Sequence, residues 1–415
     1  MNESIWQGDL VRESARAGRL VIFEEAPRDG AQGKTLMDAD TRIAIANIQG
    51  AMFGDDGPRH VLFTAGFPSA AKEEFEITRR VALEAEGVSV TCVCRGTPRD
   101  IDAAIAAMRG APHGRLMYFV PGSEATARHL VRKTAAESVD YSIEMAKYAL
   151  DRADGLAIDM AFADASRADR ELMIDAVSRL TAEGVASVQL ADTVGYLLPT
   201  EVFELYSDVI SRADEEAVVV AHLHNDLGVG LVNSLEAIRA GSRVVASSWL
   251  GLGERSGMTT TEQLTFLLAH NPERLEAAIG KLENPLWWTQ PDLRQIPVLA
   301  KLVSEATDTP LKITDPIVGS GVSTISTGTP FVDRATFQPY DPVSLLGLEP
   351  RVVLTQLASD RVVREAANDL NIPLTDEQVH VATQWVKSEA FRRGKAVIPD
   401  EDFRLFATGM IAQAG

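Results

Sequence analysis

Short apolar segments alternate with longer segments of helical period from Leu20 onward, and this alternation limits the folds open to the chain. The apolar segments are predicted as eight strands, over residues 20–25, 60–66, 88–94, 115–120, 156–162, 185–191, 217–224 and 243–250. Apolar residues in the segments between them recur three or four apart, as on one face of a helix, for example over residues 38–52, 137–153 and 199–213. Repeated strand–helix units predict a parallel sheet with its helices outside.

Eight such units are the number that closes a (β/α)₈ barrel. Residues 20–270 match the roughly 250 residues typical of that fold, and a doubly wound open sheet is the alternative. After His270 the pattern changes to a connector that contains Pro and Trp, and then to a mainly helical tail. We therefore expect a barrel with an N-terminal extension over residues 1–270, a connector over 271–299 and helical subdomains over 300–415.

Two features outside the barrel allow more than one interpretation. Trp287 and Trp288 in the connector are expected either to meet a partner subunit or to pack within the chain. The Gly-, Ser- and Thr-rich segment over residues 318–331 can cradle phosphate, but it lacks a GK[ST] ending, so we interpret it as a loop.

Charge and cysteine content narrow the class of partner. The formal net charge of −19 opposes binding to nucleic acid or to anionic membranes. The N-terminus lacks an apolar core of signal length, and no apolar segment approaches the length of a membrane span. The only cysteines, Cys92 and Cys94, lie two apart on a predicted strand, where they cannot form a disulfide and are interpreted as buried apolar residues. These features predict a cytoplasmic protein.

Polar residues that follow the strands are the candidate site, because barrel enzymes act at the C-terminal ends of their strands. The richest segments are PRDGAQ (residues 27–32), HLHND (222–226) and GLGERSG (251–257). His222 and His224 are two apart on a strand, so both imidazoles face the same side. Together with Asp29 after the first strand they form a candidate set of ligands for a divalent metal ion, with open positions for substrate.

Arg28 precedes the candidate metal ligand Asp29. Its guanidinium would stabilise an enolate or alkoxide oxygen that develops beside the metal ion. A structural ion pair is the alternative role for this arginine.

The three segments, together with GFP (residues 66–68), ADASRAD (163–169) and ADTVGY (191–196), resemble the metallolyase barrel family. That family includes isopropylmalate synthase, homocitrate synthase, citramalate synthase and 3-hydroxy-3-methylglutaryl-CoA lyase. The GLGERSG and HLHND segments are most similar to the condensing branch, which joins acetyl-CoA to a 2-oxo acid and hydrolyses the thioester. The segments over residues 318–326 and 339–354 are similar to the subdomains that follow the barrel in these synthases.

The resemblance implies a role for each matching residue. It implies Asp29, His222 and His224 as ligands of Mg²⁺, Mn²⁺ or Zn²⁺, Arg28 as the catalytic arginine, and acetyl-CoA as co-substrate. Substrate contacts are expected from Gln32, Arg95, Tyr118, Arg167, Thr193 and Asn225. The resemblance also implies a homodimer.

Several positions depart from the family pattern. Met258 replaces an asparagine near the metal, Met117 replaces a histidine of the fourth strand, and Ala161 and Ala163 replace polar residues of the pocket. The histidine that follows the barrel in the family falls on residues 319–323, which contain none. Glu254, Asp164 and Tyr340 are therefore the candidates for proton transfer.

The altered pocket suggests a different oxo acid. If Arg95 and Arg167 face its side chain, an anionic acid such as oxaloacetate or phosphonopyruvate is expected rather than 3-methyl-2-oxobutanoate. Pairing of these arginines with nearby aspartates is the alternative.

Two other function classes remain open. One is a carbon–carbon lyase or aldolase of the same family, although the CoA lyases carry a reactive cysteine after the eighth strand and residues 251–258 contain none. The other is a non-catalytic homologue that binds a metabolite.

Overall fold

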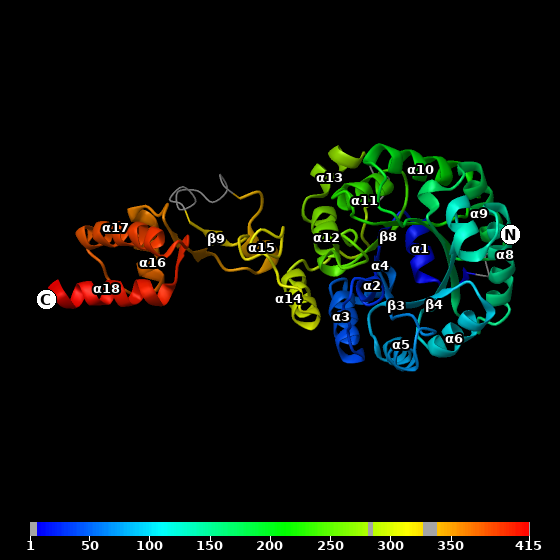
Figure 1. Cartoon of the computed structure of the whole chain (residues 1–415), viewed down its shortest axis with the longest axis horizontal. Helices are drawn as coiled ribbons and strands as arrows, with labels where there is room; N and C mark the ends of the chain where they lie inside the picture. The colour runs from blue at the N-terminus through cyan, green and yellow to red at the C-terminus, as the bar shows by residue number, and fades with distance from the viewer. Residues whose placement is uncertain (1–5, 281–284, 327–337, 415) are drawn as a thin grey trace. The chain divides into compact units, whose positions relative to one another are not determined.

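The computed structural model describes residues 6–280, 285–326 and 338–414. The chain divides into two compact units, Met1–Pro310 and Leu311–Gly415. In the first unit eight parallel strands close into a barrel, with helices around it (Figure 1). The (β/α)₈ barrel prediction is confirmed, and the open doubly wound sheet is wrong because β8 pairs with β1.

All eight barrel strands lie where the apolar segments predict them. Their bounds are β1 Val21–Glu24, β2 Val61–Thr64, β3 Ser89–Arg95, β4 Gly114–Pro121, β5 Ala157–Ala163, β6 Ser187–Asp192, β7 Val219–Leu223 and β8 Val244–Ser247. The barrel closes where Val21 pairs with Val244 while Ile22 pairs with Val61 of β2. Every strand of the closed sheet is therefore paired on both edges.

The helices of the barrel unit begin at residues that cap them. Asp38 accepts a hydrogen bond from the Thr41 amide at the start of α3, and Thr134 forms a capping box with Glu137 at α8. The helices are α1 Leu10–Arg16, α2 Asp29–Gln32, α3 Ala39–Ala51, α4 Gly57–His60, α5 Lys72–Glu84, α6 Pro98–Met108, α7 Glu124–Thr126, α8 Ala135–Leu150, α9 Arg170–Glu183, α10 Pro199–Arg212, α11 Gly230–Arg239, α12 Thr261–His270, α13 Pro272–Ile279 and α14 Gln295–Thr307.

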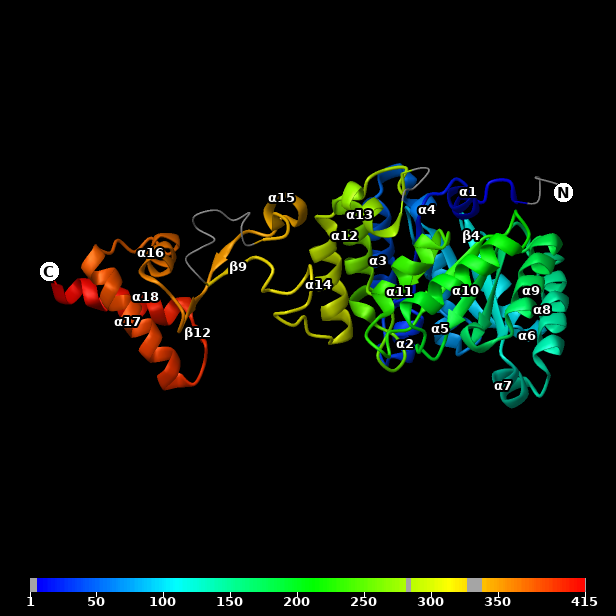
Figure 2. The same ribbon diagram turned by 90° about the horizontal axis from the view of Figure 1, so that it is seen from above.

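The barrel interior is filled with apolar side chains and is plugged at one end. Phe23, Leu62, Met117 and Val220 from different strands belong to one buried cluster, which Val11 of α1 joins. Figures 1 and 2 show α1 at one end of the barrel, with α2 at the opposite end. The C-terminal ends of the strands are therefore the open end, where a site can form.

The predicted connector contributes to the packing of the barrel unit. The indole of Trp287 packs against Phe53 and His60, with ring centroids 5.3 Å apart in both pairs. The indole nitrogen of Trp288 donates to the Ser14 hydroxyl (3.0 Å). Trp287 is therefore packed within the chain, whereas Trp288 is bonded to the chain but stays 43% exposed. Helices α13 and α14 lie partly or wholly within residues 271–299, so the division at residues 270 and 300 stays a prediction about domain organisation.

The second unit is mainly helical and has its own core. Val362, Val379, Val386 and Phe403 are buried together in it. Its helices are α15 Pro342–Leu346, α16 Asp360–Asp369, α17 Asp376–Arg393 and α18 Asp400–Ala414. Two pairs of short strands accompany them, β9 Thr324–Ile325 with β10 Arg351–Val352 and β11 Leu354–Thr355 with β12 Val397–Ile398. The segment over residues 318–331, interpreted as a loop, contributes β9, and its last residues lie outside the described residues.

Cys92 and Cys94 are free and fully buried on β3, as predicted. Burial raises the pKa of both thiols well above the usual range, so neither is a reactive thiolate. Among the described residues, no helix has both the length and the apolar character needed to cross a membrane.

Candidate metal centre

The candidate site lies at the C-terminal ends of β1 and β7. His222 is the fourth residue of β7, and His224 follows the strand on the same face. Asp29 begins the short helix α2 just after β1. All three side chains are at least 95% buried. A closed barrel is needed to bring these residues together, because β8 and β1 lie between β7 and α2.

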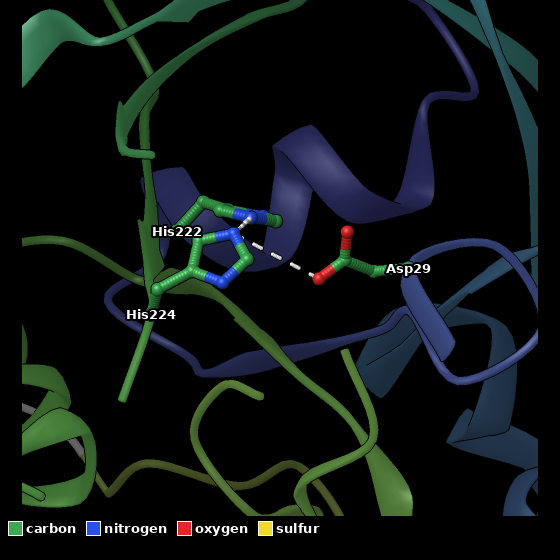
Figure 3. A group of neighbouring side chains, drawn as sticks. All are labelled: Asp29, His222 and His224. Carbon is green, nitrogen blue, oxygen red and sulfur yellow. Dashed lines mark hydrogen bonds and ion pairs between the residues drawn. The ribbon is translucent and has the colours of Figure 1, made fainter. Parts of the chain in front are cut away.

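The three side chains converge (Figure 3). The Nε2 atoms of His222 and His224 are 3.3 Å apart, and His224 Nε2 lies 3.8 Å from Asp29 Oδ2. One ligand atom from each residue lies within 4.8 Å of the others. Ligands that share one ion at bond lengths of about 2.1 Å lie at most about 4.2 Å apart. The separations of 3.3 and 3.8 Å satisfy this limit.

His222 is in the protonation state that a metal requires. Burial lowers the pKa of His222 to about 3, and the neighbouring His224 and Arg28 act in the same direction while Glu25 opposes them. His222 is therefore neutral near pH 7 and offers a lone pair. His224 Nδ1 lies 3.2 Å from the carbonyl oxygen of Gly257 and donates to it in the tautomer that leaves Nε2 as the ligand atom.

Two polar atoms of the site are buried without a hydrogen-bond partner, Asp29 Oδ2 and His222 Nδ1. A buried carboxylate oxygen without a donor is costly unless a cation binds it. Two imidazoles and one carboxylate form a donor set that suits divalent transition metals and leaves coordination positions open. The residues present therefore fit a divalent metal ion.

Arg28 lies beside the metal-ligand set and is oriented by Glu25, a residue that the sequence interpretation missed. Its Nε and Nη2 donate to the two oxygens of Glu25, both at 2.9 Å, and its Nη1 donates to Gln32 (3.3 Å). The same Nη1 lies 3.5 Å from Asp29 Oδ1. Burial opposes the charge of Arg28, but Glu25, Asp29 and Glu254 more than offset this and raise its pKa. Arg28 is therefore a permanent cation next to Asp29.

The rim of the mouth is held by two arginine–aspartate pairs. Arg167 donates from Nε and Nη2 to Asp164 (2.7 Å each), whose amide donates to the Thr193 hydroxyl (2.8 Å). Arg255 donates to both oxygens of Asp226 (2.9 and 2.8 Å) and to the Thr193 carbonyl (2.7 Å). These bonds fix the loops after β5, β6, β7 and β8 to one another, with Thr193 at the centre.

The loop after β8 approaches the site closely. A Cβ on Gly253 would lie 2.8 Å from Asp29 Oδ2, so only glycine allows this approach. Met258 ends the loop fully buried in the same apolar cluster as Met117 and Ala161, and it forms a β-bridge with His224. Three of the residues that replace polar groups of the family, Met117, Ala161 and Met258, therefore form an apolar wall inside the barrel.

Three predicted site residues have other environments. Tyr118 is buried and its hydroxyl donates to the Ser142 carbonyl of α8 (2.8 Å), so the prediction that it contacts substrate is wrong. The strand turns its side chain toward the helices because β4 residues alternate and Met117 faces the interior. Arg95 pairs with Asp100 of α6 (2.5 Å). Tyr340 belongs to the second unit, and its role stays a prediction.

The predicted substrate contacts Asn225 and Gln32 differ in their surroundings. The side-chain oxygen of Asn225 accepts a hydrogen bond from the backbone amide of Gly230 at the start of α11 (2.8 Å), and the backbone amide of Asn225 donates to the Gly257 carbonyl (2.9 Å). Gln32 is exposed at the end of α2. The sequence interpretation missed Glu25, although the sequence could have indicated it, because two acids end a strand that is otherwise apolar. Asp226 and Arg255 lie inside the motifs, but nothing in the sequence pairs them.

Comparison with known proteins agrees with this geometry. The sequence model of the family described as HMGL-like matches residues 19–303. The curated 2-isopropylmalate synthase of Prochlorococcus marinus is 29% identical over 410 residues, which covers 95% of this chain and 74% of that protein. The enzyme of the same name from Trichodesmium erythraeum is 28% identical over 95% of this chain and 73% of its own length.

Solved structures share the fold. The HMG-CoA lyase of Bacillus subtilis superposes with a TM-score of 0.56 at 20% identity, over 71% of this chain and 95% of that one. An HMG-CoA lyase from Acinetobacter baumannii, in complex with coenzyme A and 3-methylmalate, gives 0.54 at 21% identity, over 72% and 94% of the two chains.

Proposed function

The chain belongs to the HMGL-like family, and we propose that it joins acetyl-CoA to a 2-oxo acid in a reaction that depends on a divalent metal ion, and then hydrolyses the thioester. The observation that carries the proposal is the buried set of Asp29, His222 and His224 beside Arg28 at the mouth of the barrel. The relatives named 2-isopropylmalate synthase, which match 95% of the chain, support this class of reaction.

The reaction requires carbon–carbon bond formation followed by hydrolysis. The methyl group of acetyl-CoA loses a proton, its carbon bonds to the carbonyl carbon of the oxo acid, and the carbonyl oxygen takes up a proton. Water then cleaves the thioester, and free CoA thiol and a carboxylate are released. A divalent ion held by Asp29, His222 and His224 would polarise the oxo-acid carbonyl and offset the charge that develops on its oxygen.

Arg28 is the proposed stabiliser of the developing oxyanion. It carries a permanent charge, and Glu25 fixes two of its nitrogens, so little reorientation is needed when substrate binds. Its Nη1, which is turned toward Gln32 and Asp29, is the nitrogen left to meet the substrate.

Glu254 is the proposed group for proton transfer in the barrel unit. Its side chain is 50% exposed in the loop after β8, and it lies close enough to Arg28 for its charge to raise the pKa of that arginine. Asp164 is a weaker candidate, because Arg167 binds both of its oxygens and the Ser123 hydroxyl also donates to it (2.5 Å).

The apolar wall supports an oxo acid with an uncharged side chain. Met117, Ala161 and Met258 belong to it, and Phe67 and Phe119 pack against the same cluster. The expected anionic oxo acid depended on Arg95 and Arg167, but Asp100 and Asp164 already bind these guanidinium groups. An acid such as oxaloacetate or phosphonopyruvate would have to displace these carboxylates.

A carbon–carbon lyase reaction is the second candidate function, since the HMG-CoA lyase of Bacillus subtilis shares the fold of this chain. The position of the cysteines disfavours a lyase that uses a reactive thiol. Cys92 and Cys94 are buried on β3, and Val93 between them faces the interior, so both thiols point away from the site.

Release of free thiol from acetyl-CoA tests the proposal directly. The protein would be assayed with pyruvate, 3-methyl-2-oxobutanoate, 2-oxoglutarate and oxaloacetate, each with EDTA or with added Mg²⁺, Mn²⁺ or Zn²⁺. We expect thiol release that needs both the metal ion and an oxo acid, and a higher kcat/KM for the two uncharged side chains. Thiol release at a rate that does not depend on the oxo acid would contradict the condensing function. So would the absence of thiol release with every acid.

A further inference from the structure

We propose that Glu25 is a positioning residue that holds Arg28 away from Asp29 and so keeps Asp29 available to the metal ion. This inference rests on the proposed function, because it concerns the ion that the reaction needs. Glu25 lies one residue beyond β1, is fully buried and touches three different parts of the site. It binds Arg28 at 2.9 Å through both oxygens, it accepts from the Thr64 hydroxyl (3.3 Å), and its Oε1 lies 3.8 Å from His222 Nδ1.

Arg28 has two acidic neighbours that compete for its guanidinium. Glu25 receives two charge-assisted hydrogen bonds, whereas Asp29 Oδ1 lies at 3.5 Å from Nη1, beyond good hydrogen-bond distance. Only a small movement of Arg28 separates the present arrangement from one in which its planar fork binds the Asp29 carboxylate. Such a pair would occupy a metal ligand with a cation.

Charge leads to the same conclusion. Glu25 and Asp29 are two acids beside the single guanidinium of Arg28, so the formal charge of the three side chains is −1. Without Glu25, Asp29 would be left as the acid beside Arg28, and a divalent ion would compete with Arg28 for the Asp29 carboxylate. Coulomb repulsion in a buried site is weakly screened, so the loss would weaken metal binding.

The contact with Thr64 adds a mechanical restraint. Thr64 ends β2, and its hydroxyl is fully buried next to Glu25 Oε2, the same oxygen that Arg28 Nε binds. Glu25 is thus held between two neighbouring strands and cannot follow Arg28 if that side chain moves. A carboxylate fixed in this way sets the direction of Arg28 rather than adapting to it.

The test is a titration with Mn²⁺ alone, followed by calorimetry or by the EPR signal of free Mn²⁺, on a set of variants. Glu25→Gln keeps the volume but removes one of the acceptors that Arg28 needs. We expect it to weaken Mn²⁺ binding by roughly 10-fold or more, in the range seen when a group behind a metal ligand is changed. Glu236→Gln on α11 is the matched control, since Glu236 also forms a pair with an arginine three residues later, far from the site.

A double variant separates positioning from a general loss of structure. Glu25→Gln with Arg28→Met removes both the orienting acid and the competing cation, and it leaves no unpaired buried charge if Glu25→Gln alone folds poorly. We expect Mn²⁺ binding by the double variant to recover toward the wild-type value. Unchanged binding by Glu25→Gln, or a double variant that binds as weakly as Glu25→Gln, would overturn the inference.

The substrate assay keeps this inference separable from the proposed function. If the wild-type protein binds Mn²⁺ but releases no thiol with any oxo acid, the proposed function is contradicted. The Mn²⁺ titrations of the variants still decide the role of Glu25 in that case. In an active wild type, we expect Glu25→Gln to lower kcat, and to have no further effect on kcat when Arg28 is already replaced. Independent, multiplicative losses of kcat would show that Glu25 does not act through Arg28.

Discussion

The metal centre depends on single side chains that no other group can replace. Asp29, His222 and His224 each offer one ligand atom, and two polar atoms among them are buried without a protein partner. A site with three protein ligands and open positions loses most of its affinity when one ligand is removed. Replacement of a ligand is therefore expected to affect the metal centre more than the fold.

We predict that His222→Ala and Asp29→Asn each abolish metal-dependent thiol release, and that the far-UV circular dichroism stays that of the wild type. Bound metal would be measured by elemental analysis after dialysis against Mn²⁺. His380→Ala is the control, because His380 is 63% exposed in the second unit. Near wild-type turnover in either ligand variant would refute the assignment of the ligands.

At the scale of elements, charged side chains tie the loops after the strands together, in addition to backbone contacts such as the hydrogen bond from the Asn225 amide to the Gly257 carbonyl. Arg255 joins the loop after β8 to Asp226 after β7 and to the Thr193 carbonyl after β6. Because Arg255 is 38% exposed, the pair adds about 1 kcal/mol or less to stability. Its effect should be on the position of Thr193, the predicted contact of the oxo acid.

Arg255→Ala is therefore expected to raise the KM for the oxo acid about tenfold, equivalent to about 1.4 kcal/mol of binding free energy, with a smaller effect on the KM for acetyl-CoA. Steady-state kinetics with each substrate varied in turn would measure this. Arg239→Ala, an exposed arginine on α11, should leave both constants unchanged. An equal rise for both substrates would contradict a local role for the loop after β6.

Glu24 connects elements in a different way, through a buried carboxyl group. It accepts hydrogen bonds from the amides of Ala26 and Trp249 and from the Thr261 hydroxyl, and so ties β1 to β8 and α12. Burial raises the pKa of Glu24 from 4.5 to about 8, although these hydrogen bonds act in the opposite direction. The folded protein therefore retains a proton that the unfolded chain releases at much lower pH.

This shift makes stability depend on pH with a defined sign. Between pH 4.5 and pH 8 the folded state binds more protons at Glu24 than the unfolded state, so the free energy of unfolding falls as pH rises. Gln at this position keeps an acceptor for the amides and a donor for Thr261 but does not titrate. As pH rises from 5.5 to 8.5, we expect the free energy of unfolding of Glu24→Gln to increase relative to that of the wild type, by an amount on the order of a few kcal/mol.

Urea unfolding at the two pH values would measure this difference, with Glu236→Gln on the surface of α11 as the control. A gap between wild type and Glu24→Gln that is the same at both pH values would contradict the raised pKa.

At the scale of the whole molecule, the chain consists of a barrel unit and a second, mainly helical unit with its own core. The family resemblance implies a homodimer, and of the two connector tryptophans Trp287 packs within the barrel unit while Trp288, which is 43% exposed, can still meet a partner. We predict a mass of twice 44.9 kDa by light scattering at micromolar concentration. A monomeric mass under these conditions would contradict the dimer.

Sequence alone was enough to predict the barrel and its candidate metal ligands. Strand and helix periods are local properties, so the segments around Val21, Val219 and the other strands could be located without a structure. The same holds for His222 and His224, because residues two apart on a strand share a face. Asp29 could be added because the first and last strands of a closed barrel must meet.

Only the tertiary structure decided which charged groups are free to act. Arg167, Arg95 and Arg28 look alike in the sequence, but Asp164, Asp100 and Glu25 each bind one of them. The strand position of Tyr118 turned it outward, toward α8. Side-chain pairing depends on distances between residues far apart in the sequence and on the competition between several acids for one cation, and no local pattern encodes either. The fold of this protein therefore follows from its periodicity, whereas the charge state and shape of its site follow from packing.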